Sequence, residues 1–203
     1  MNNFFTQKNF TMLKKTFIVS FFAILIFKYS CAQTFMHGIG ATVSVMAGRV
    51  HNPGESYDAA VAFTNFTWFP RFNLNESDIS SLSIGMPVGA GVGLSNGGSD
   101  GVYIGFDLPL AIDYNRGRKS TYENESRMGW YVGCGFSYTF TFWTGGYSSS
   151  NKLESYGPLL RTGIRFGAGS KNPDRATTLG FYFRPGLDKD KLKTGGIAVL
   201  MEV

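Results

Sequence analysis

The stretch Ser81 to Ser95 reads S-L-S-I-G-M-P-V-G-A-G-V-G-L-S, and it decides the fold of this chain. Every even position from Leu82 to Leu94 is apolar, whereas every odd position is Ser, Gly or Pro. A repeat of two is the period of a β-strand, whose side chains point alternately to opposite faces of a sheet. The stretch therefore predicts a strand with one bulky apolar face and one face that carries almost no side chains.

The same period recurs after each turn-like segment of the chain. Clusters of Gly, Pro, Asn, Asp and Ser separate the periodic runs, as turn chemistry requires. In the second run the apolar positions change phase around Asn65, which predicts a β-bulge. Eight strands are predicted in all: residues 34–50, 58–69, 81–95, 101–115, 127–143, 154–167, 176–184 and 194–203.

Residues 1–32 have the features of a cleavable signal peptide. A short basic segment precedes the apolar run 16–27, which is too short to cross a bilayer as a helix. Ser30 and Ala32 provide the small residues of a cleavage site before Gln33, and acylation of Cys31 is the alternative. Residues 33–203 are then the mature chain and have the length of one domain.

The basic balance of the chain comes mainly from this N-terminal segment. Four of the 19 Lys and Arg residues precede Gln33, whereas all 14 acidic residues follow it. The mature part is therefore nearly neutral, which argues against a nucleic-acid partner. It contains one cysteine, Cys134, so an internal disulfide is excluded.

Eight alternating strands fit either a soluble barrel with its apolar face inward, as in lipocalins, or a transmembrane barrel with its apolar face outward. The polar face favours the second, because it carries mainly Gly, Ser and Thr, which suit a narrow crowded lumen. Trp130 and Phe142 share the apolar face and lie roughly 30 Å apart along the barrel axis, which matches the apolar band and its aromatic girdles. An eight-stranded antiparallel up-and-down transmembrane β-barrel is therefore predicted.

Pro87 and Pro109 interrupt two predicted strands, where a missing N–H weakens the hydrogen-bond ladder. If the turn between the strands is centred on Gly98, the two prolines face each other. We interpret them as a shared bulge or bend, and a split strand is the alternative.

The chain resembles the small outer-membrane β-barrel family of Gram-negative bacteria, with OmpA-like and OmpX-like architecture. The resemblance depends on the signal ending Cys-Ala-Gln and on three segments: 68–74, 83–88 and 105–110. It implies an outer-membrane location, insertion by the outer-membrane machinery, contact with membrane lipid and both termini in the periplasm. Two features depart from the family pattern: the chain ends Met-Glu-Val instead of in an aromatic residue, and its longest connector, 116–126, falls on the periplasmic side.

Charged residues on the lumen parity are the main candidate site. Buried charges need partners, so they predict either a salt-bridge plug, which we favour, or a gate or ion path. Simple hairpin registers place Asp107, Gly135 and Arg161 at one level, with the glycine leaving room for the arginine. The predicted lumen charges are Asp107, Asp113, Arg161, Arg165, Arg184 and Glu202.

The sequence offers little catalytic chemistry. His37 falls on the lipid-facing parity and His51 in a connector, with no nucleophile motif beside either one. Two histidines and one thiol on separate segments do not form a zinc site, and Gly89–Gly93 lacks the helix and spacing of a phosphate-binding loop. We therefore expect no enzyme activity, cofactor or metal.

The leading hypothesis is a non-enzymatic envelope scaffold, adhesion or surface-interaction protein, with the connector 144–152 as a contact surface. The partner is not identified by the sequence. The alternatives are a narrow porin-like channel, a membrane-embedded lipid- or peptide-hydrolysing enzyme that uses His37 or His51, and a soluble lipocalin-like barrel.

Overall fold

The structure, a computed structural model, describes residues 34–52, 55–96, 102–143, 153–167 and 174–203. The chain divides into two units, residues 1–33 and 34–203, and all of the described residues belong to the second. The predicted signal peptide and Cys31 therefore lie outside the described residues. No helix within the described ranges is long and apolar enough to cross a membrane.

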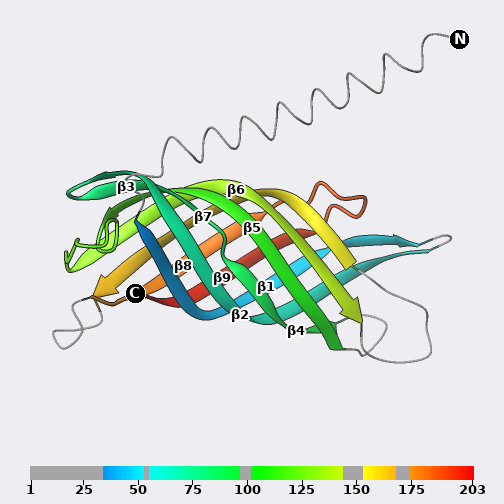
Figure 1. Cartoon of the computed structure of the whole chain (residues 1–203). Coiled ribbons are helices and arrows are strands. Elements are labelled where there is room, and N and C mark those ends of the chain that lie inside the picture. The colour runs from blue at the N-terminus through cyan, green and yellow to red at the C-terminus, as the bar shows by residue number, and fades with distance from the viewer. Residues whose placement is uncertain (1–33, 53–54, 97–101, 144–152, 168–173) are drawn as a thin grey trace, which may run out of the picture. The chain divides into compact units, whose positions relative to one another are not determined.

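The described residues form one closed antiparallel sheet (Figure 1). β3 and β4 both pair with β2 on one side and with β5 on the other, so they are two halves of one strand in an eight-stranded ring. The ring closes where β1 pairs with both β2 and β9. The strands are β1 (Phe35–Asn52), β2 (Glu55–Ser77), β3 (Ser80–Gly85), β4 (Val88–Asn96), β5 (Val102–Gly117), β6 (Met128–Trp143), β7 (Leu153–Gly167), β8 (Ala176–Arg184) and β9 (Lys193–Glu202).

The predicted outward direction of the apolar face is confirmed. Leu82 and Val92 of the opening stretch are 40% and 54% exposed, whereas Ser83 between them is fully buried. Aromatic pairs add to the outer wall, among them Tyr114 and Trp130, whose ring centroids are 5.8 Å apart. The soluble alternative is therefore wrong, because an outer wall of this kind needs lipid around it.

The predicted bulge at Asn65 is wrong. The pairing of β2 with β1 and with β4 runs through Asn65 without a shift, and the irregularity lies instead between Asn73 and Asn75. The apparent change of phase has a packing cause. Val61 and Phe63 point into the lumen on the same parity as Asn65, so this part of the inner face is apolar.

The strand predicted over residues 81–95 is split at Met86 and Pro87. The interpretation as a shared bulge is therefore wrong, and the alternative of a split strand is confirmed. Gly85 pairs with Ala111 and Gly89 with Asp107, so Pro87 and Pro109 oppose each other as predicted. The register is the same on both sides of the break. The prolines therefore interrupt the hydrogen bonds of the wall without displacing its strands.

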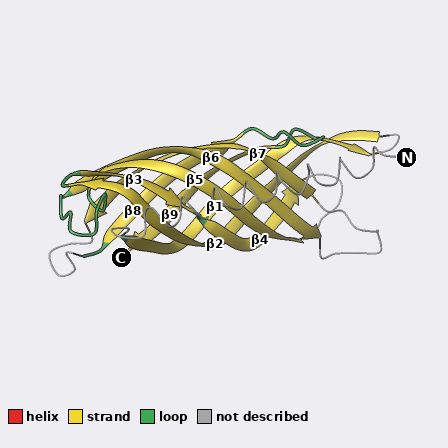
Figure 2. Ribbon diagram, turned by 45° about the horizontal axis from the view of Figure 1, so that its top comes forward, coloured by secondary structure: helices red, strands yellow, loops and turns green. Residues whose placement is uncertain are grey.

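The barrel has two different ends (Figure 2). We call the end that holds Phe35 and Glu202 the termini end, and the opposite end the loop end. β2, β5 and β7 end at the termini end, whereas β1, β4, β6 and β8 end at the loop end.

Candidate functional site: the charged lumen

A buried carboxylate near the termini end holds two arginines. Glu202 Oε1 lies 2.8 Å from Arg165 Nε, and Glu202 Oε2 lies 2.9 Å from Arg71 Nη2. Thr178 donates a hydrogen bond to the same carboxylate at 2.5 Å. All of these side chains are almost fully buried, so the contacts join β2, β7, β8 and β9 inside the barrel.

A second ion pair lies next to the first. Arg161 Nε is 3.5 Å from Asp113 Oδ1, and the two residues flank Gly133 in the register of β5, β6 and β7. The guanidinium of Arg161 also lies over two rings, 4.4 Å from the centroid of Phe69 and 4.9 Å from that of Tyr131. Cation–π contacts of this kind help a charge to remain in a desolvated site.

The predicted level of Asp107, Gly135 and Arg161 is wrong. Asp107 pairs with Thr139 across β5 and β6, and Arg161 pairs with Gly133 across β6 and β7. The physical reason is the register of the hairpins. The prediction assumed that each turn is centred between its strands, and the strands pair in a different register. The space over Gly133 is occupied by the carboxylate of Asp113, the ion-pair partner of Arg161.

The third ion pair lies further toward the loop end, where Arg184 Nη1 is 3.6 Å from Asp107 Oδ1. Ser137 and Thr139 donate hydrogen bonds to Asp107 at 2.8 and 2.7 Å. All six predicted lumen charges therefore point inward, and they form three separate ion-pair groups.

A cavity of about 40 Å³ separates the ion pair of Arg161 from that of Asp107. Its wall includes side chains from opposite sides of the barrel, among them Thr67, Tyr131 and Tyr182. A cavity of this size holds a few water molecules. A smaller cavity of about 10 Å³ continues past Asp107 toward Met46 and Phe63.

The β5–β6 connector closes the termini end. Residues 118–121 are buried, although a connector of this length would ordinarily extend into solvent. The carbonyl of Lys119 accepts a hydrogen bond from Arg71, and that of Ser120 accepts hydrogen bonds from Asn73 and Ser81. The connector therefore folds back into the mouth of the barrel and is held there by the inner wall.

An apolar cluster closes the other end of the described lumen. Its members come from four strands and from the β8–β9 connector, and none is more than 9% exposed. The cluster consists of Met46, Val61, Phe63, Tyr103, Leu153 and Leu192.

His37 points away from these charges. His37 is half-buried on the outward parity of β1, with its ring stacked 6.0 Å from that of Phe35. His51 belongs to the end of β1, paired with Ser56, and not to a connector as predicted. Within the described part of the chain, no group of three or more His, Cys, Asp or Glu residues is placed to bind a metal ion.

The comparisons with solved structures match this barrel. No protein-family model and no curated protein sequence matches the chain. Neisserial surface protein A is 12% identical, with a TM-score of 0.52, and the match covers 85% of this chain and 98% of that one. For Ail, the attachment invasion locus protein of Yersinia pestis, the identity is 11%, the TM-score 0.51 and the coverage 84% and 98%. For the outer membrane protein OprG of Pseudomonas aeruginosa, these values are 13%, 0.51, and 84% and 93%.

The chain has the fold of the small outer-membrane β-barrels. The closed ring and the apolar outer wall agree with an outer-membrane location, as the sequence predicts. The identities are low, so the likeness to these outer-membrane barrels concerns the fold.

Several residues of the charged lumen are not indicated by the sequence pattern. Arg71 is among the most buried side chains, but the predicted second strand ended at residue 69 and did not include it. Asn115 also follows the inward parity of β5 and accepts a hydrogen bond from Arg71 at 3.0 Å. The sequence does not indicate that Lys119 is buried, because the residues of a connector do not alternate with a regular period.

Proposed function

We propose that the protein is a non-conducting, non-enzymatic outer-membrane barrel that acts as an envelope scaffold or surface-interaction protein. One observation carries this proposal: side chains and a folded-back connector fill the described lumen at both ends. An eight-stranded barrel is narrow enough for its interior to be filled in this way.

The apolar cluster is the stronger of the two barriers to ions. Phe63 and Met46 line the smaller cavity and also belong to the cluster, so they separate the polar interior from the loop end. An apolar constriction excludes water, and an ion without water or polar ligands does not pass. The charged side chains below it are held in ion pairs, which favours a structural plug over an ion path.

Planar-bilayer recording tests the proposal against the porin-like channel. The wild-type barrel is expected to show no unitary conductance, whereas Phe63→Ala is expected to join the cavities to the loop end and allow current. Phe66→Ala is the matched control, because this ring lies on the same strand but is 62% exposed on the outer wall. Unitary conductance in the wild-type protein would support the channel instead.

The surface role depends on the connectors of the loop end. The proposed contact surface, 144–152, lies outside the described residues. Replacing it with a Gly/Ser segment of equal length is expected to abolish adhesion of barrel-expressing cells while leaving the heat-modifiable migration of the barrel unchanged. Equal adhesion by both proteins would remove this segment from the proposal.

A further inference from the structure

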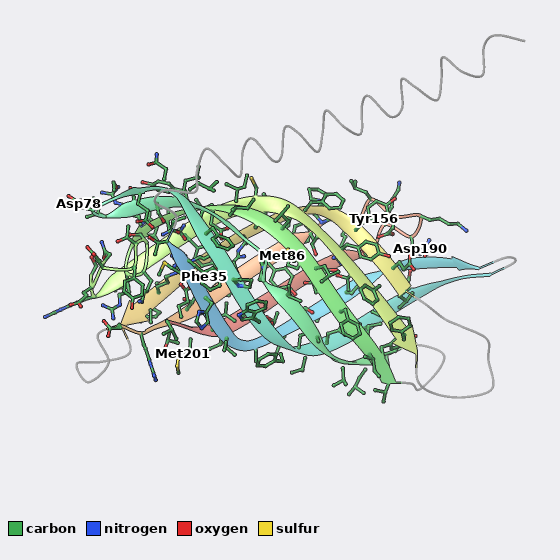
Figure 3. All side chains as sticks on the ribbon, in the orientation of Figure 1. Phe35, Asp78, Met86, Tyr156, Asp190 and Met201 are labelled. Atoms are coloured by element: carbon green, nitrogen blue, oxygen red, sulfur yellow. The ribbon has the colours of Figure 1, made fainter. Side chains whose placement is uncertain are left out.

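The larger lumen cavity lies in the middle part of the barrel. Met86, the residue before Pro87 in the cavity wall, is labelled in Figure 3 between Asp78 at the termini end and Asp190 at the loop end. The volume of about 40 Å³ has room for about three water molecules. The buried β5–β6 connector lies on one side of this space and the apolar cluster on the other. The side chains of the wall therefore determine what the cavity holds.

The lumen between the cavity and the termini end carries more buried positive charge than negative charge. Within the described ranges, and without counting Arg118, four cationic side chains are buried there against two acidic ones. The cations are Arg71, Lys119, Arg161 and Arg165, and the acids are Asp113 and Glu202. Uncompensated charge is costly in a desolvated interior, so this part of the lumen favours one further negative charge.

Arg161 brings this positive charge to the cavity wall. It lines the cavity, and its Nη1 has no hydrogen-bond partner among the residues that the structure describes. Its contact with Asp113 runs through Nε at 3.5 Å, longer than the roughly 2.7–2.9 Å of a charge-assisted hydrogen bond. The two cation–π contacts of the guanidinium supply no acceptor for Nη1. Because buried N–H groups ordinarily have a partner, Nη1 indicates that an acceptor is missing.

The acidic residue of the cavity does not fill this role. Asp107 lies across the cavity from Arg161, and its Oδ1 accepts hydrogen bonds from Ser137 at 2.8 Å and from Thr139 at 2.7 Å. The same oxygen lies 3.6 Å from Arg184 Nη1, which balances its charge. The carboxylate of Asp107 is therefore already compensated on its own side.

Neutral donors complete the wall beside Arg161. Thr42 and Thr67 both line the cavity, and their hydroxyl oxygens lie 2.7 Å apart in one hydrogen bond. A hydroxyl has a single hydrogen to donate, so the member of the pair that accepts keeps its own hydrogen for another acceptor. Asn65 lies in the same wall, and its amide carries two further donors.

We propose that this cavity binds one monatomic monovalent anion of the halide class. The anion accepts hydrogen bonds from Arg161 and from the free hydroxyl hydrogen of the Thr42–Thr67 pair, and it takes the place of one water molecule. Buried Leu159 and Leu200 in the wall lower the local dielectric, which strengthens the attraction to the guanidinium. The proposal concerns the interior of the barrel and does not depend on the proposed scaffold role.

Bromide is the probe, because its anomalous scattering identifies the ion and its position. The wild-type protein is refolded in detergent with sodium bromide and crystallised, and diffraction data are collected at the bromine absorption edge. We expect an anomalous peak inside the cavity beside Arg161. An empty cavity, or one with density for water alone, would overturn the proposal.

Urea midpoints in sodium bromide and in sodium gluconate at equal ionic strength measure the binding in solution. Gluconate is too large for the cavity and therefore reports only the general effect of salt. An ion that binds only the folded barrel raises the folding equilibrium constant about tenfold for each tenfold rise in its concentration above Kd. We expect this rise in bromide for the wild-type protein.

Ala198→Leu fills the cavity without changing a charge, because Ala198 lines it opposite Thr42 in the register. This variant is expected to lose the difference between the two salts. Ala62→Leu is the matched control, since Ala62 is exposed on the outer wall and its variant should respond to bromide as the wild-type protein does. A bromide response that persists in Ala198→Leu would place the ion elsewhere and overturn the proposal.

The R161M/D113L double variant tests the guanidinium itself. Replacing both members of a buried ion pair leaves no charge without its partner, so we expect this variant to fold, as heat-modifiable migration verifies. It is expected to show equal midpoints in bromide and gluconate. A folded double variant that still responds to bromide would exclude Arg161 as the ligand and contradict the proposal.

Discussion

Arg165 Nε lies 2.8 Å from Glu202 Oε1, and this contact links β7 to β9 across the intervening strand β8. The same carboxylate holds Arg71 from β2. One acidic side chain near the end of the chain therefore neutralises two arginines that have almost no access to water.

Glu202→Gln is expected to destabilise the barrel by about 3–5 kcal/mol, because removing one partner leaves buried charges uncompensated. The measurement is the urea midpoint of unfolding, followed by heat-modifiable migration. Glu125→Gln is the control, since Glu125 is exposed in the β5–β6 connector. Equal midpoints for the two variants would show that the buried network contributes nothing to stability.

Gly133→Ala is expected to destabilise the barrel by about 1–3 kcal/mol through overpacking. A Cβ at this position would overlap the carboxylate of Asp113 and approach Ile112 O to 2.7 Å. The ion pair of Asp113 with Arg161 would have to shift. The carbonyl of Ile112 cannot move freely, because it belongs to the backbone of the neighbouring strand β5. The free energy of unfolding from a urea titration measures the effect.

Gly195→Ala is the matched control for this substitution. A Cβ there meets nothing closer than 3.9 Å, so we expect a change within about 0.5 kcal/mol. If Gly133→Ala lowers the free energy of unfolding no more than Gly195→Ala does, the close fit around Asp113 contributes nothing to stability.

The wall of the barrel was predictable because its signal is local. Alternation along each strand shows which side chains share a face, and the outward stripe from Leu82 to Leu94 follows this rule. The same rule placed the six lumen charges on the inward parity. Parity does not depend on how neighbouring strands are aligned.

The partners of those charges were not predictable, because they depend on the register. Asp107 and Asp113 share one parity, so alternation cannot say which of them meets Arg161. The register across β5 and β6 depends on left-handed positions at the end of β5 and in the connector, with φ of +76° at Gly117 and +54° at Lys119. The alternation of residues along the strands does not indicate that this connector folds back into the lumen.

Lys119→Met is expected to stabilise the barrel at neutral pH. Burial lowers the pKa of the Lys119 amine below its ordinary value of 10.5, and the charge of Arg118 lowers it further. The folded state therefore disfavours the charged amine, a penalty that methionine does not have. As the pH rises toward 10.5, the folded protein releases this proton before the unfolded chain does, so the wild-type protein gains stability and the difference from the variant shrinks.

Urea midpoints measured from neutral pH up to 10.5 test this pH dependence. Lys189→Met, in the exposed β8–β9 connector, is the control for replacing a lysine outside the lumen. A Lys119→Met advantage that stays constant or grows with pH would contradict the assignment of the effect to the buried amine.

Lys191→Gly is expected to raise the stability of the barrel. Glycine relieves the left-handed strain at φ +48°, which favours the folded state by up to about 1 kcal/mol after the greater freedom of the unfolded chain is counted. Lys191→Ala provides the comparison, because alanine removes the charge and keeps the strain. We therefore expect glycine alone to raise the urea midpoint. Equal urea midpoints for the two variants would show that the left-handed backbone at Lys191 costs no stability.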